Sequence, residues 1–108
     1  MTVSALGRVN VTSPGTSVPL SSDPSKRAAK ILIQMIPGLS SKAYVGVSGM
    51  NRATLAGVIR VLWPNPGGGI SDQFFLESSD GSNSLYLSHY HLDMDVAGEG
   101  ALISYWTA

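Results

Sequence analysis

The sequence of 108 residues contains no cysteine. Disulfide bridges and thiolate metal sites are therefore excluded, while the redox compartment stays open. No apolar run approaches the ~20 residues that a helix needs to cross a bilayer, so we expect no membrane partner. The N-terminus also lacks a charged segment followed by an apolar run, and we expect no signal peptide.

Charge is scarce as well. Charged residues make up 13% of the chain, about half the usual share, and seven basic residues balance seven acidic ones. No run of lysine or arginine is present, so binding of nucleic acid through its phosphates is not expected. A surface with so few charges has to rely on small polar residues and backbone, or be partly covered by partner subunits. A surface that is covered by partner subunits would be typical of a protein that works in an assembly.

What the sequence does contain is a series of short strand patterns. With 44% hydrophobic residues, the chain has the length and composition of one domain spanning residues 1–108. Alternating or apolar segments bounded by Gly, Pro, Asn and Asp predict strands at 6–12, 16–20, 28–36, 43–48, 58–63, 73–77, 85–96 and 101–107. Seven or eight short strands without a long helix predict an all-β fold, a two-sheet antiparallel β-sandwich of jelly-roll-like form.

Three local features refine this prediction. Residues 1–25 could form edge strands, where Pro19 would fit, or an arm that orders only against a neighbour. Gly46 interrupts a strand and indicates a bulge or a close backbone contact. Three glycines at 67–69 predict a flexible loop rather than a phosphate-binding loop, since no Lys-Ser/Thr follows.

The clearest pattern lies in residues 85–108. Leu85, Leu87, His89, His91, Asp93 and Asp95 alternate with Tyr86, Ser88, Tyr90, Leu92, Met94 and Val96. The segment Ala97-Gly98-Glu99-Gly100 then supplies two glycines for a tight turn before a second apolar run. The sequence therefore predicts a long antiparallel hairpin at the end of the domain.

One group of metal-ligand residue types appears on this predicted strand. His89, His91, Asp93 and Asp95 would share one face, with neighbours ~6.6–6.8 Å apart. The pair His89-x-His91 is similar to the start of a cupin metal site, but the later glutamate and third histidine of cupins are missing. His89, His91 and Asp95 could still hold iron or zinc. The alternative is a polar strand face toward solvent or a neighbouring subunit, and we predict no catalytic residues and no cofactor.

Aromatic residues suggest an interface instead. Phe74 and Phe75 are adjacent, as are Tyr105 and Trp106, so one ring of each pair should lie on the outer face of its sheet. Exposed rings of this kind are typical of subunit contacts. The predicted interface consists of Phe75, Tyr90 and Trp106 together with Val9 and Val11 of the N-terminal segment.

Several short motifs, taken in order, resemble a known class of proteins. They are Arg8-Val9-x-Val11-Thr12, Gly15-Thr16-x-Val18-Pro19-Leu20, Ala29-x-Ile31-x-Ile33-Gln34, Tyr44-Val45-Gly46-x-Ser48-Gly49, Leu62-x-Pro64 and Leu92-Asp93-x-Asp95-Val96-Ala97-Gly98-Glu99-Gly100. Their order resembles small virion structural proteins of tailed bacteriophages, of the capsid decoration (cement) or head-fibre kind. Members of that group commonly have Asn-Thr-Gly before the Tyr-Val-Gly strand, where this chain has Leu39-Ser40-Ser41-Lys42.

The resemblance implies a β-sandwich, often trimeric, that binds the major capsid protein on the outer surface of a phage head. It implies no catalytic residues and no small-molecule substrate. Two other functions stay open at this point. One is a small cupin-like metal enzyme that uses His89, His91 and Asp95, and the other is a tail or baseplate module that binds host glycans through Trp63 or Trp106.

Overall fold

The strands form where apolar side chains alternate with polar or half-exposed ones. In β4 (Lys30–Met35) the side chains alternate strictly between half-buried and buried, so one face of the strand meets the core. A computed structural model describes residues 2–65, 67 and 72–108. The predicted glycine loop at 67–69 therefore lies largely outside the described residues. No helical segment in the described part of the chain is long and apolar enough to cross a membrane.

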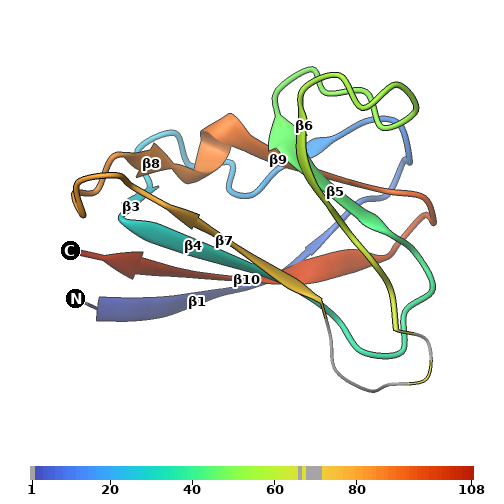
Figure 1. Cartoon of the computed structure of the whole chain (residues 1–108), viewed down its shortest axis with the longest axis horizontal. Helices are drawn as coiled ribbons and strands as arrows, with labels where there is room; N and C mark the ends of the chain where they lie inside the picture. Colours follow the sequence, from blue (N-terminus) through green and yellow to red (C-terminus); the bar gives the residue numbers. More distant parts are fainter. Residues whose placement is uncertain (1, 66, 68–71) are drawn as a thin grey trace.

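Two four-stranded antiparallel sheets make up the molecule (Figure 1). The first sheet has the order β1 (Thr2–Asn10), β10 (Gly100–Thr107), β4, β7 (Gln73–Glu77). The second has the order β2 (Val18–Pro19), β9 (Tyr90–Met94), β5 (Ala43–Val47), β6 (Val58–Leu62). The predicted all-β sandwich is confirmed.

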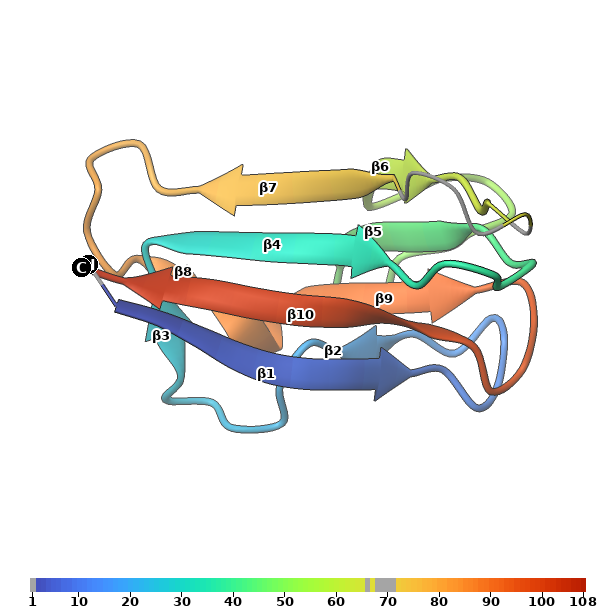
Figure 2. The ribbon, with the colours of Figure 1, turned by 90° about the horizontal axis from the view of Figure 1, so that it is seen from below.

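The two sheets pack as layers around one core (Figure 2). The first sheet contributes Ile31, Ile33 and Ile103, and the second contributes Val45, Leu62 and Leu92, all of which are buried. Between β1 and β7 the chain passes repeatedly from one sheet to another. Among the described strands, β5 and β6 are the only two that follow each other in sequence and also pair with each other. This order is that of two packed antiparallel sheets. It places the first and last strands side by side, with Thr2 opposite Thr107.

The prediction of a C-terminal hairpin over residues 85–108 is wrong. Residues 85–96 are divided into β8 (Leu85–Tyr86), a 3₁₀ turn η1 (Leu87–His89) and β9. β9 then pairs with β2 and β5 in the second sheet, whereas β10 pairs with β1 and β4 in the first. The turn at 97–100 thus crosses between layers, and Gly98 has the positive φ of 82° expected there.

The N-terminal residues belong to the sheets of their own chain. β1 pairs with β10 along its length, with a bulge between Ala5 and Gly7. β2 is an edge strand, a position that tolerates Pro19 because its missing N–H is not needed there. β3 (Arg27–Ala28) pairs with β8 at one end of the sandwich. Residues 2–10 therefore do not form an arm that waits for a neighbour.

Candidate functional site

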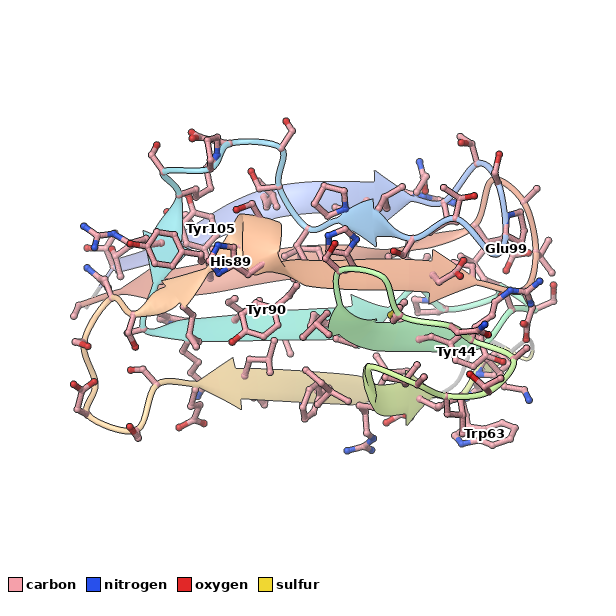
Figure 3. The ribbon with its side chains drawn as sticks, turned by 90° about the horizontal axis from the view of Figure 1, so that it is seen from above. Tyr44, Trp63, His89, Tyr90, Glu99 and Tyr105 are labelled. Atoms are coloured by element: carbon pink, nitrogen blue, oxygen red, sulfur yellow. The ribbon has the colours of Figure 1, made fainter. Side chains whose placement is uncertain are left out.

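The metal ligands suggested by the sequence do not come together. His89 lies in η1 and stacks on Tyr86, with 4.9 Å between ring centroids. His91 lies in β9, where its Nδ1 is 3.0 Å from the hydroxyl of Ser17. Asp95 instead binds Arg52 and Tyr44, and Figure 3 shows His89 and Tyr44 toward opposite ends of the molecule. Among the described residues, no group of three or more His, Asp or Glu is arranged to hold a metal ion.

This outcome corrects the hypothesis of a site formed by His89, His91 and Asp95. The 3₁₀ turn removes His89 from the strand, so the period of two that aligned the four side chains is broken before β9 begins. The Ser17–His91 contact also falls short of a catalytic triad. In the part of the chain that the structure describes, no carboxylate is hydrogen-bonded to His91.

An aromatic pair, with Phe75 exposed and Trp106 half-buried, marks the outer face of the first sheet. Phe75 of β7 and Trp106 of β10 lie with their ring centroids 6.2 Å apart. The ammonium group of Lys30, on β4 between them, lies 4.3 Å from the centre of the Phe75 ring and 5.4 Å from that of Trp106. Lys30 also approaches Glu77 at 3.7 Å. Phe75 is 37% exposed even with this neighbour in place.

Other apolar side chains extend this surface. The strand register places Val3 opposite Trp106, and Leu32 opposite Phe75. Val3 is 57% exposed. Leu102, on the same face of β10 as Trp106, is also exposed. We call Val3, Leu32, Phe75, Leu102 and Trp106 the sheet patch. It gives the outer face of the first sheet an apolar surface of the kind that protein interfaces cover.

Three residues of the predicted interface lie elsewhere. Val11 is fully buried in the core, and its backbone pairs with the turn near Glu99. Val9 and Tyr90 are partly buried and pack against the same core. Their side chains point inward because the alternation of β1 and β9 directs them between the sheets. The prediction is therefore wrong for Val11, whereas for the partly buried Val9 and Tyr90 it stays a prediction, and Phe75 and Trp106 lie on an outer face.

A second feature is a polar cluster beneath the loop that joins β5 to β6. Arg52 of this loop binds the carboxylate of Asp95 at 2.5 Å, and its Nε lies 3.9 Å from Oδ2 of Asp93. Tyr44 donates a hydrogen bond to Asp95 at 3.2 Å. Burial, with the added effect of the Asp95 carboxylate, raises the pKa of the Tyr44 hydroxyl above its ordinary value.

Asp93 is the unusual member of this cluster, because it is a fully buried carboxylate. Its Oδ1 accepts hydrogen bonds from the backbone N–H groups of Gly15 and Met94, at 3.1 and 2.8 Å. Its Oδ2 has no hydrogen-bond partner among the described residues. The carboxylate therefore ties the 11–17 connection to β9 and depends on Arg52 for its compensating charge.

A pocket of about 370 Å³ opens beside this cluster. It is lined by Gly15, Gly49, Met50, Asn51, Arg52 and Ala53. Glycine, alanine and methionine provide four of the six lining residues, and Asn51 and Arg52 add polar side chains, so the wall is mixed in polarity.

The sequence offered no signal for this arrangement. The period of two places Asp93 on the same side as His89 and His91, and Arg52 lies between the predicted strands 43–48 and 58–63, where no pattern is found. Only the tertiary contact between 11–17, 49–57 and β9 brings the residues together. At another edge, Trp63 is 60% exposed, with the Lys42 ammonium 4.6 Å from its ring centre (Figure 3).

No protein-family model, no curated protein and no solved structure matches the chain significantly.

Proposed function

We propose that the chain is a non-enzymatic structural protein of a phage virion. In this proposal it is a decoration protein that binds the major capsid protein on the outer surface of the head, as a homotrimer. The observation that carries the proposal is the sheet patch, in which Phe75 and Trp106 present two neighbouring rings on the outer face of the first sheet. Buried aromatic anchors of this kind dominate the binding energy of protein interfaces.

Two further observations support this function. Only 13% of residues are charged, so a partner can cover much of the surface without removing many charges from water. A sandwich of two antiparallel sheets also occurs in viral capsid proteins, although the same architecture serves lectins and cupins. Fold-level analogy alone does not decide function. The order of the sequence motifs, which resembles that of decoration proteins, is our reason for preferring a capsid role to a lectin or cupin role.

The benefit to the shell follows from mass action. A protein that binds the assembled lattice and not its free subunits stabilises the lattice by an amount set by its free concentration and its dissociation constant. Symmetry repeats the contact across the head, so that a modest affinity at each position adds up over many copies.

Binding to shells tests the proposal. The probe is the expanded, undecorated head of the phage that encodes the protein, and the measurements are co-sedimentation and the melting temperature of the head. We expect the wild-type chain to bind and to raise that temperature. Phe75→Ser and Trp106→Ser should each weaken binding at least about tenfold, since each removes an aromatic anchor.

Trp63→Ser is the matched control, because Trp63 is an exposed ring outside the sheet patch. It should bind like the wild type. Heads that are equally robust without the protein would contradict the proposal. So would an equal affinity of all four proteins.

A second candidate function rests on Trp63. An exposed ring with a nearby ammonium group can stack on a sugar while the cation meets a polar substituent, and Lys42 stands in that position. A glycan array probed with the wild type and with Trp63→Ala tests this reading. Binding that disappears in the variant would support a glycan-binding tail module, and an array without hits would remove it.

A further inference from the structure

One end of the sandwich carries two adjacent cationic side chains over aromatic rings. Arg27 of β3 lies opposite Tyr86 of β8, and its guanidinium carbon is 5.6 Å from the centre of that ring. The ammonium group of Lys26, the preceding residue, lies 5.5 Å from the centre of the Tyr105 ring. His89 is exposed and stacks on Tyr86, and Figure 3 shows it toward the same end of the molecule as Tyr105. We call these five residues the cationic end.

Backbone hydrogen bonds fix the segment that carries the two cations. β3 and β8 pair with each other as a separate two-stranded sheet. The N–H of Leu87 donates to the carbonyl of Lys26 at 3.1 Å, and the N–H of Ala29 donates to that of Trp106 at 2.8 Å. The segment is therefore tied both to β8 and to the last residues of β10, so its side chains start from an ordered backbone.

Neither cation has a partner of opposite charge. In the part of the chain that the structure describes, the side chains of Lys26 and Arg27 form no ion pair and no hydrogen bond. Lys26 influences the charge of Asp23, but Oδ1 of that carboxylate already accepts the N–H and the hydroxyl of Ser25, at 2.9 and 2.7 Å. Three other basic residues do approach a carboxylate: Lys30, Arg52 and Arg60.

Two such cations suit an oxyanion. A guanidinium group over a ring can keep its N–H donors, which lie along its edge, available to a ligand. That edge matches two oxygens of a carboxylate or sulfate group, and the ammonium group of Lys26 adds a second charge. Because the rings of Tyr86 and Tyr105 already favour these positions of the cations, less side-chain entropy is lost when a ligand binds.

The exposed ring indicates what carries the oxyanion. One face of the His89 ring rests on Tyr86, which leaves the other for a flat apolar surface. The C–H groups of a sugar ring form such a surface, and an acidic polysaccharide repeats a carboxylate or sulfate along its chain. An acidic peptide offers the charge without the ring. A nucleic acid needs several phosphates neutralised, which two cations on a chain of zero net charge do not provide.

We propose that the cationic end binds an acidic polysaccharide. A carboxylate or sulfate group pairs with Arg27 and Lys26, and a neighbouring sugar ring stacks on His89. These residues are distinct from the sheet patch and from Trp63. The inference therefore goes beyond the proposed function and does not rest on it.

The test uses the purified protein without phage heads, so its outcome is separate from that of the shell-binding experiment. Isothermal titration calorimetry at low ionic strength measures the binding of heparin, which is sulfated, and of polygalacturonate, which is carboxylated. Neutral dextran is the blank. We expect at least one acidic polymer to bind and dextran not to bind, and added salt should weaken the binding. The polymer that binds identifies the anionic group.

Three substitutions locate the site. Arg27→Gln should weaken binding about tenfold and Lys26→Gln about fivefold, because each removes a charged hydrogen-bond donor. His89→Ser should weaken it about threefold, because the stacking surface is lost. Lys42→Gln is the matched control, since Lys42 also lies over a ring but has no second cation beside it in the sequence. It should bind like the wild type. Melting temperatures show whether each variant is folded.

Four outcomes would overturn the proposal. One is that neither acidic polymer binds at up to about 1 mM sugar units. Another is an affinity that Arg27→Gln lowers no more than Lys42→Gln does, which would mean unspecific attraction between charges. The last two are binding of polyglutamate or of oligothymidylate at least as tight as that of the polysaccharides. The partner would then be an acidic peptide or a single-stranded nucleic acid.

Discussion

Asp93 shows how one buried side chain can hold three segments together. It accepts hydrogen bonds from Gly15 and Met94 and faces Arg52 across 3.9 Å. We expect Asp93→Ala to lower the free energy of unfolding by about 2–4 kcal/mol, since two N–H groups and a cation lose their acceptor. Asp93→Asn keeps the Oδ1 acceptor and should cost less, about 1 kcal/mol.

Urea unfolding measures both values. Asp80→Ala serves as the control, because Asp80 is exposed and hydrogen-bonds only to nearby Ser82. It should stay within about 0.5 kcal/mol of the wild type. If Asp93→Ala behaved like Asp80→Ala, the proposed role of Asp93 as the anchor of the loops would be wrong.

Because of Tyr44, the free energy of unfolding should fall as the pH becomes alkaline. Its pKa is raised in the folded state, first by burial and then by Asp95, so the folded protein favours the neutral hydroxyl. The contribution of the neutral Tyr44 hydroxyl to the unfolding free energy is fully present below the unfolded pKa of about 10. It is lost as the pH rises through the higher pKa of the folded state. Tyr44→Phe removes the titrating group. Between about pH 9 and 11, the wild type should therefore lose more unfolding free energy than the variant. Parallel urea titrations at several pH values check this, and identical slopes would contradict it.

At the scale of single elements, the bulge in β5 requires a glycine. The register of β5 and β6 shifts between Val45 and Gly46, as the sequence predicted. A Cβ atom at position 46 would lie 2.2 Å from the carbonyl oxygen of Gly57 and 2.7 Å from the sulfur of Met50. Since backbone stands in the way, Gly46→Ala should cost about 1–3 kcal/mol in unfolding free energy.

Thermal and urea unfolding of Gly46→Ala measure that cost. Ser48→Ala is the matched control, because Ser48 is an exposed neighbour just beyond the strand. A loss that is no larger for position 46 than for position 48 would mean that the bulge opens without strain.

Most strands could be predicted from the sequence, because periodicity and turn residues are local. The segment 73–77 coincides with β7, and 43–48 and 58–63 each exceed their strands by one residue. The pattern at 85–96 led to the wrong hairpin. An alternation with period two indicates which face of a strand a residue occupies, but it does not indicate which other strand is the pairing partner. Residues 87–89 form a 3₁₀ turn instead, and that change moved His89 away from His91.

At the scale of the whole molecule, the sequence predicted the two-sheet architecture but only part of the candidate site. Phe75 and Trp106 lie on an outer face because adjacent residues on a strand point in opposite directions. Val11 was misplaced because β1 ends at Asn10, and the chain there turns into the core. The Arg52–Asp93 contact and the positive φ of Leu55 arise from loops packed by tertiary structure. No local sequence pattern predicts this contact or this backbone angle.

The position of β10 has a consequence for synthesis on the ribosome. This last strand lies inside the first sheet, between β1 and β4, and joins them through hydrogen bonds on both sides. As the chain emerges, β1 has no partner in the first sheet until residues 100–107 have left the exit tunnel. Its hydrogen-bonding groups are open to other nascent chains throughout that interval. Slow translation of the segment before β10 would prolong this exposure, so the yield of folded protein should depend on the speed at which β10 is made.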